Sequence, residues 1–202
     1  KATLRVAAGD RDHEAEIAQS ECYTSKQFVK YWLHCAHLLV DSQKMSKSAG
    51  NFYTLRDLIE RGYTGREIRY ALISVHYRLP LNFTLAGLDA ARAALSRIDA
   101  WVRRLQERAQ AASPDGVPSF PESESFLKAL DDDLNISGAL ACLFDWIRDT
   151  NRMMDLGELS EAQAAKCLAD FGVINSILAC EAAQIDVPKE ITQLLEERQN
   201  AR

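Results

Sequence analysis

Apolar residues recur every three or four positions through most of the chain after residue 54, and this spacing predicts α-helices. The pattern is clearest from about Thr84 to Ala112, where one buried stripe is expected: Leu88, Ala91, Leu95, Ile98, Val102 and Leu105. Further helices are expected at about Glu122–Leu130, Ile136–Asp155, Ser160–Ala179 and from Pro188 to the end. Helices with one apolar side and short connections predict a helical bundle.

Capping residues, a glycine and a proline mark the ends of the two helices expected before this bundle. Thr54–Asp57 and Thr64–Glu67 both have the spacing of a capping box, in which a Thr and an acidic residue three positions later cap one helix N-terminus. The first of these helices is expected to end at Gly62 and the second before Pro80. Between residues 112 and 121, three prolines and a glycine predict a loop between two antiparallel helices.

The first fifty residues follow a different pattern. His13–Ser20 is expected to be a helix, the aromatic and apolar runs Tyr31–His34 and Ala36–Val40 predict strands, and Asp41–Gln43 predicts a turn. The expected fold is mainly α, with the tail of an α/β domain followed by a helical bundle. We divide the chain at residues 1–53, 54–83 and 84–202.

Composition narrows the function classes. Lys and Arg number 24 against 29 Asp and Glu, so the net charge of −5 excludes a globally basic nucleic-acid-binding coat. One face of the helix from Thr84 is nevertheless locally basic, and it is either solvated or a contact for nucleic-acid phosphates: Arg92, Arg97, Arg103, Arg104 and Arg108. No apolar run approaches the roughly 20 residues of a membrane span. Five cysteines without a CxxC pair fit free thiols in a reducing cytoplasm.

One segment, Lys44-Met45-Ser46-Lys47-Ser48, carries specific chemistry. Its two lysines lie three positions apart among small hydroxyl residues, and Gly50 follows. Such a flexible cationic loop can close over a polyphosphate, with hydroxyl and backbone N–H groups donating further hydrogen bonds. A solvated Lys/Ser turn is the alternative for any short motif of this kind. Here the loop lies between an apolar run and a capped helix, which favours the phosphate-binding interpretation.

This pentapeptide is identical to the second signature of class I aminoacyl-tRNA synthetases, and several neighbouring segments resemble cysteinyl-tRNA synthetases: His13–Glu21, Tyr31–His34, Gly50–Phe52, His76–Phe83 and Asp131–Asn135. The resemblance implies that cysteine reacts with ATP and Mg²⁺ to form cysteinyl-adenylate, and that the acyl group then passes to the cysteine tRNA. It implies that Lys47 contacts ATP, that Lys44 positions the loop, and that Met45, Ser46 and Ser48 belong to the ATP site. Residues 54–83 would be a helical region that contacts the tRNA stem, and residues 84–202 a tRNA-binding bundle cut before a small C-terminal domain.

The family also binds a zinc ion that selects the substrate thiolate. In the family motif a His and a Glu four residues apart are zinc ligands, and Glu16 matches that Glu. Asp12 stands where the ligand His is expected, His13 matches a second, non-ligand His, and the family's cysteine ligands belong to segments upstream of Lys1. The resemblance therefore implies Glu16 as a metal ligand, while the Asp12 replacement argues against zinc in this chain.

Other polar residues have two interpretations each. Trp32 and His34 either line the substrate pocket or form a packed pair on a strand. The acidic run Asp131–Asp133 resembles a metal-binding cluster, but capping of the following helix is the favoured role. Arg78, Arg92 and Arg103 are candidates for facing the tRNA.

The first class I signature and most of the nucleotide-binding sheet of the family have no counterpart here. We therefore expect a chain truncated at both ends, inactive by itself, monomeric and cytoplasmic. Two alternatives remain open at this stage. One is a class I ligase that joins cysteine to a small amine such as an amino sugar, and the other is a non-catalytic helical tRNA-binding module.

Overall fold

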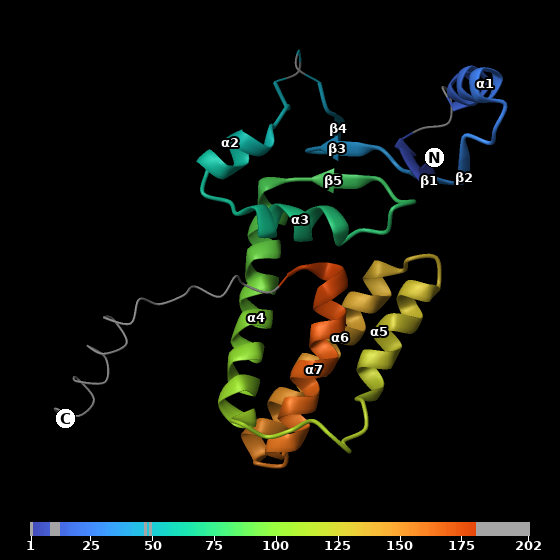
Figure 1. The fold of residues 1–202 in the computed structure, drawn as a ribbon. Coiled ribbons are helices and arrows are strands. Elements are labelled where there is room, and N and C mark those ends of the chain that lie inside the picture. Colours follow the sequence, from blue (N-terminus) through green and yellow to red (C-terminus); the bar gives the residue numbers. More distant parts are fainter. Residues whose placement is uncertain (1, 9–12, 47, 49, 181–202) are drawn as a thin grey trace, which may run out of the picture.

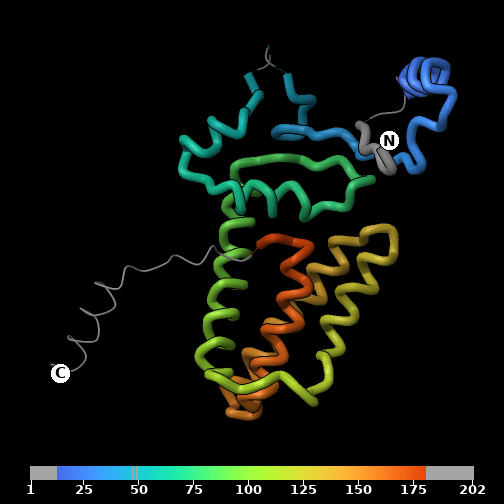
Figure 2. Tube along the Cα trace, viewed as in Figure 1, coloured from blue at the N-terminus to red at the C-terminus, as the bar shows by residue number. Residues whose placement is uncertain are grey.

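The computed structural model describes residues 2–8, 13–46, 48 and 50–180, and Figure 1 shows a part made of short strands and helices above a bundle of long helices. Figure 2 traces the same path as a tube. The mainly helical prediction is confirmed. The helix predicted from Pro188 lies outside the described residues. Within the described ranges, every helix is too short or too polar to span a lipid bilayer.

The N-terminal part is a strand–helix–strand unit. Strand β1 (Ala2–Ala8) pairs in parallel with β2 (Val29–Cys35), and helix α1 (His13–Thr24) connects them in sequence. Two adjacent parallel strands require such a crossover connection. The strand predicted at Tyr31–His34 is confirmed within β2, whereas β1 was missed because its apolar run is short and does not alternate.

A second sheet lies at the base of the lysine loop. Its strand order is β4-β3-β5, where β3 (Leu38–Val40) runs antiparallel to β4 (Gln43–Lys44) and parallel to β5 (Leu81–Phe83). Asp41 and Ser42 form the predicted turn, and both have positive φ, at 49° and 64°. Two consecutive positive φ angles suit a tight hairpin. Strand β5 departs from the expected helical character of residues 54–83, because the chain after Pro80 is extended and pairs with β3.

Helices α2 (Leu55–Glu60) and α3 (Gly65–Ile73) begin at the two predicted capping boxes, which the structure confirms. Thr54 Oγ1 accepts from the Asp57 N–H at 3.1 Å, and Asp57 Oδ2 accepts from the Thr54 N–H at 2.7 Å. Gly62, with φ of 87°, follows the end of α2 as predicted. These elements enclose a small core that we call the loop-side core: Val40, Leu58, Ile68, Phe83 and Leu88.

The bundle consists, in the described residues, of α4 (Leu85–Ala109), α5 (Pro121–Asp131), α6 (Ile136–Leu156) and α7 (Glu161–Leu178). All six residues of the predicted stripe on α4 are buried. Trp101 lies at the centre, with its ring centroid 5.1 Å from that of Trp146 and 5.3 Å from that of Phe171. The bundle therefore has an aromatic centre shared by three helices.

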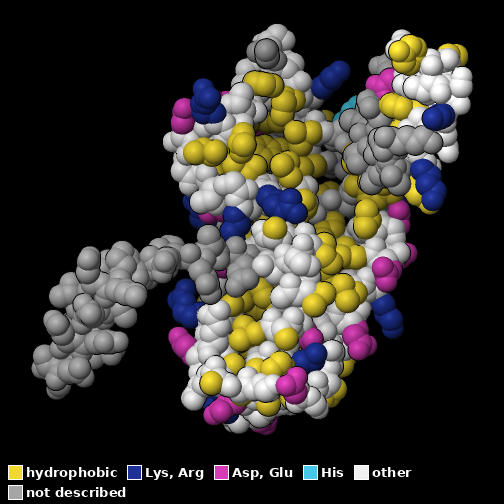
Figure 3. Space-filling view, viewed as in Figure 1, with side chains coloured by type: hydrophobic (Ala, Val, Ile, Leu, Met, Phe, Trp, Pro, Cys, Tyr) yellow, Lys and Arg dark blue, Asp and Glu magenta, His cyan; other side chains and the backbone are white. Residues whose placement is uncertain are grey.

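Several arginines of α4 hold helices together. Arg92 Nε donates to Glu67 Oε1 at 2.7 Å, which joins α4 to the start of α3. Arg104 donates to Asn151 and to Asp155 on α6. On the face shown in Figure 3, basic and acidic side chains are interspersed over the bundle. Part of the arginine face thus has a structural role.

We expect Glu67→Gln to lower the free energy of unfolding by about 1–2 kcal/mol at neutral pH, because it removes charge-assisted hydrogen bonds and weakens a helix cap. The Arg92 guanidinium lowers the pKa of Glu67 below its usual value. A carboxyl whose folded pKa is depressed stabilises the protein above its unfolded pKa, about 4.3, and this contribution is lost as the pH falls through the folded pKa. Urea unfolding of both proteins from neutral to acidic pH tests this expectation. A difference that persists unchanged in acid would contradict it.

Candidate functional site

The lysine loop, residues 44–51, leaves β4 and returns toward α2, and one side chain fastens its two ends. Asn51 Oδ1 accepts from the Ser46 N–H at 2.9 Å, and Asn51 Nδ2 donates to the Lys44 carbonyl at 3.2 Å. The same Nδ2 lies 3.5 Å from the Val40 carbonyl. The loop is therefore closed at its base, next to β3 and β4 in the upper part of Figure 1.

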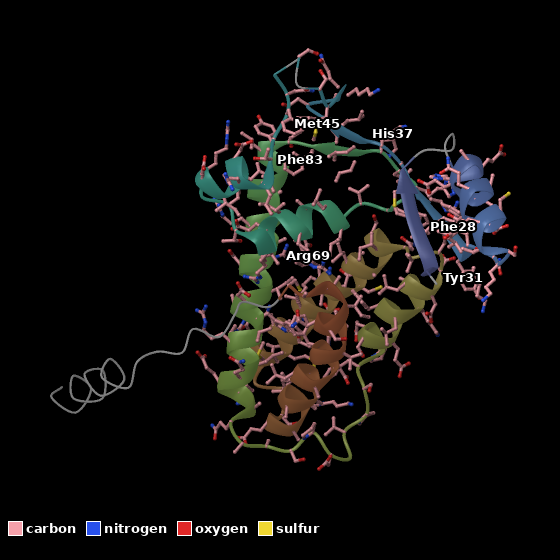
Figure 4. The ribbon with its side chains drawn as sticks, turned by 45° about the horizontal axis from the view of Figure 1, so that its top comes forward. Phe28, Tyr31, His37, Met45, Arg69 and Phe83 are labelled. Atoms are coloured by element: carbon pink, nitrogen blue, oxygen red, sulfur yellow. The ribbon has the colours of Figure 1, made fainter. Side chains whose placement is uncertain are left out.

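The Met45 side chain attaches the loop to the apolar core beneath it. This half-buried side chain packs against the loop-side core, and Figure 4 shows it close to Phe83 at the upper sheet. This apolar contact positions the polar residues that follow. The sequence motif thus combines one half-buried apolar residue with residues available to a ligand.

Some polar side chains of the loop are accessible. Lys44 and Ser48 are exposed, and the Ser46 and Ser48 hydroxyl oxygens lie 3.2 Å apart. Lys47 lies outside the described residues. A lysine ammonium and paired hydroxyls on an accessible loop can donate hydrogen bonds to phosphate oxygens.

A second group of site candidates lies on α1 and β2. The His13 ring centroid is 4.9 Å from that of Trp32 and 5.0 Å from that of His34, in an edge-on arrangement with the latter. Glu16 lies one turn further along α1 and is half-buried. In Figure 1 this helix and the β1–β2 pair stand to one side of the lysine loop. Trp32 and His34 therefore both pack against His13, and the choice between a packing role and a place in the substrate pocket stays a prediction.

The described residues do not by themselves fit the implied zinc. Among them, no three His, Cys, Asp or Glu side chains gather closely enough to hold a metal ion. Asp12 lies outside the described residues, so the prediction for Glu16 and Asp12 is not tested. We assign no reaction step to zinc.

The acidic run before α6 has a different role from the one predicted. Asn135 is the N-cap of α6, and its Oδ1 accepts from the Gly138 N–H at 3.0 Å. Asp133 instead binds Tyr77 and Arg78. The capping prediction for this run was wrong because a closer Asn takes the cap position and Asp133 points to the turn after α3.

Comparison with known proteins assigns both parts of the chain. A family model for the tRNA synthetases class I (C) catalytic domain matches residues 10–93, and one for the DALR domain matches residues 125–180. The chain is 45% identical over 196 residues to a protein named cysteine--tRNA ligase from Chlamydia felis, which covers 94% of this chain. It is 43% identical to the protein of that name from Chlamydia caviae and 39% identical to that from Protochlamydia amoebophila.

Residues 10–93 of this chain belong to the class I tRNA synthetase catalytic domain family. The chain spans 41% of the Chlamydia felis and Protochlamydia relatives and 44% of the Chlamydia caviae one. The crystal structure of a LeuRS from Agrobacterium radiobacter K84, in a ternary complex with tRNA and LeuAMS, shares the fold. The TM-score is 0.64 at 15% identity over 88% of this chain and 26% of that one. The predicted fold, a class I catalytic tail followed by a helical domain, is therefore confirmed.

Two features of the site are absent from the sequence-based predictions. Asn51 was noticed only as part of a family resemblance, although an Asn directly after the loop glycine is a signal for a loop-closing side chain. The contacts of Asp133 had no local signal, because its partners lie more than fifty positions earlier in the sequence.

Proposed function

We propose that the protein containing this chain attaches cysteine to its tRNA through cysteinyl-adenylate, acting as a cytoplasmic monomer on ATP taken up with Mg²⁺. The observation that carries the proposal is the lysine loop, closed by Asn51 and anchored by Met45, in a chain that resembles cysteine--tRNA ligases over nearly its whole length.

In the proposed reaction, a carboxylate oxygen of cysteine attacks the α-phosphate of ATP and pyrophosphate leaves. Negative charge grows on the departing pyrophosphate, and the ammonium of Lys47 would counter it most strongly in the transition state. Lys44, at the fastened base of the loop, would position the loop over the phosphates. The Ser46 and Ser48 hydroxyls would donate to phosphate oxygens.

We assign the parts of the chain as follows. Residues 1–53 would complete the catalytic domain, residues 54–83 would contact the tRNA stem, and residues 84–202 would bind tRNA as a bundle. The tRNA-facing roles of Arg78, Arg92 and Arg103 stay predictions. Arg103 is exposed, and within the described part of the chain it makes no ion pair, so it is the strongest of the three.

An amino-sugar ligase is less well supported, because the relatives reported above carry the name cysteine--tRNA ligase and a DALR domain model matches the bundle. A binding module without catalysis does not account for the lysine loop. Neither alternative is favoured by a separate observation.

The test is to measure cysteine-dependent exchange between ATP and pyrophosphate, and charging of cysteine tRNA, with the full-length protein that carries this chain. We expect both activities, with serine not replacing cysteine. Exchange without tRNA charging, but with product formation on an amino sugar, would favour the alternative ligase. The absence of both activities in a folded protein would overturn the proposal.

A further inference from the structure

The turn after α3 meets the turn between α5 and α6 through a set of polar contacts that we call the Tyr77–Asp133 junction: His76, Tyr77, Arg78 and Asp133. Tyr77 Oη donates to Asp133 Oδ1 at 2.6 Å, and Arg78 Nε donates to Asp133 Oδ2 at 2.7 Å. Arg78 Nη2 reaches Oδ1 at 3.3 Å, so the guanidinium binds the carboxylate at two points. Figure 2 shows these turns one above the other, in green and yellow.

Several further contacts surround the Tyr77 ring in the junction. The His76 ring stacks on the Tyr77 ring at 4.8 Å, and the Arg78 guanidinium lies 5.0 Å from the centre of the same ring. His76 Nδ1 accepts from the Arg78 N–H at 3.2 Å, and His76 Nε2 lies 2.9 Å from the Asp133 carbonyl oxygen. Because Nδ1 accepts, Nε2 carries the proton that it donates to this carbonyl. Both turns are thus joined by side-chain and backbone groups.

The other side of the junction is an unusual backbone. Asp133 and Leu134 are consecutive non-glycine residues with positive φ, at 52° and 57°. Left-handed conformations of such residues persist when surrounding contacts hold them. The bonds to Asp133 are contacts of this kind. They therefore fix the path by which the chain enters α6.

Tyr77 also contacts the part of the chain that carries the lysine loop. Its carbonyl accepts from the Ala36 N–H at 2.8 Å, and Ala36 lies between β2 and β3. Strand β3 in turn pairs with β4, from which the lysine loop departs. One residue therefore binds the turn before α6 with its side chain and the segment that leads into β3 with its backbone.

The space beside the junction is not filled by apolar side chains. A cavity of about 410 Å³ lies between α3 and the bundle, and its lining includes Leu72, Ile73, His76, Tyr77, Leu130 and Ile136. Asp133 and Arg78 side chains are 50% and 64% exposed. An exposed ion pair adds little to folding stability, whereas two-point binding of a carboxylate by Arg restricts geometry. The junction is therefore suited to orientation more than to stabilisation.

We propose that Asp133 is a positioning residue that, through Tyr77 and Arg78, holds the helical bundle at a fixed orientation to the lysine-loop sheet, so that a tRNA bound by the bundle presents its 3′ end to the adenylate. This inference rests on the proposed function. It concerns the second step of the reaction, because that is the step in which the tRNA reacts with the adenylate.

The experiment compares Asp133→Asn, Tyr77→Phe and the double variant with the unchanged full-length protein. We expect tRNA charging to fall at least tenfold in Asp133→Asn, while cysteine-dependent ATP–pyrophosphate exchange stays within twofold. Because both residues act through one contact, the double variant should lose no more than the larger single loss. The neighbouring exposed Asp131, changed to Asn, is the matched control and should alter neither activity.

Unfolding curves of each variant separate misfolding from misorientation, and Tyr77→Phe, which keeps the stacked ring, preserves the test if Asp133→Asn unfolds. Equal losses in charging and exchange, or no loss in either, would overturn the inference while leaving the proposed function intact. An unchanged protein that makes cysteinyl-adenylate but charges no tRNA would overturn the proposed function and the inference together.

Discussion

Replacing Lys47 with Ala is expected to slow cysteinyl-adenylate formation by about 10²-fold, or about 3 kcal/mol, in the full-length protein. An ammonium directed at the triphosphate gains most when charge builds on the leaving pyrophosphate, so its loss acts on the transition state. Binding of cysteine should change little. Single-turnover formation of the adenylate at saturating ATP and cysteine measures the effect.

Variants within the same loop act as controls for this effect. Lys44→Ala should be milder if that residue mainly shapes the loop base, and Ser46→Ala and Ser48→Ala should be milder still, because neutral hydrogen bonds are weaker than charge-assisted ones. If Lys47→Ala left the rate unchanged and altered only the dissociation constant of cysteine, the loop would have no part in phosphate chemistry.

The second large effect is expected in the bundle. Trp101→Ala should lower the free energy of unfolding by about 3–5 kcal/mol, because it leaves a cavity among three helices. The Trp101 side chain is 1% exposed, and its Nε1 donates to Thr150 Oγ1 at 2.8 Å. Loss of the indole therefore removes packing and leaves a buried hydroxyl with one partner fewer.

Urea unfolding followed by circular dichroism measures this change on the 202-residue chain. Trp101→Phe should lose less, since it keeps an aromatic ring against Trp146. Val173→Ala, at a position 54% exposed on α7, is the surface control and should shift the free energy by less than about 0.5 kcal/mol. Equal losses at Trp101 and Val173 would mean that the aromatic centre does not hold the bundle together.

The sequence was most informative where a signal is local. Thr54 and Thr64 each cap a helix together with a residue three positions later. The apolar residues of α4 recur with helical spacing, so the sequence shows which side of this helix is buried. Strand β5 was missed for the opposite reason. Three extended residues carry too little pattern, and only pairing with distant β3 makes them a strand.

The candidate site likewise has one part that the local sequence predicts and one part that depends on distant contacts. The lysine loop is recognisable from five consecutive letters, and its closure by Asn51 involves residues within eleven positions. The contacts of Arg78 and Asp133 depend on how the bundle docks, which no short window of sequence encodes. The contacts of these two residues could therefore not be predicted from the sequence pattern.

The closure of the lysine loop depends on the carboxamide group of a single side chain. Asn51 donates through Nδ2 and accepts through Oδ1, and among side chains of its length only a carboxamide does both. Asparagine is among the residues most prone to damage by heat and water. Hydrolysis to aspartate would remove the donor to Lys44 and bring a negative charge to the loop proposed to receive a triphosphate. A single ageing event at Asn51 would then unfasten the loop and repel its ligand at the same time.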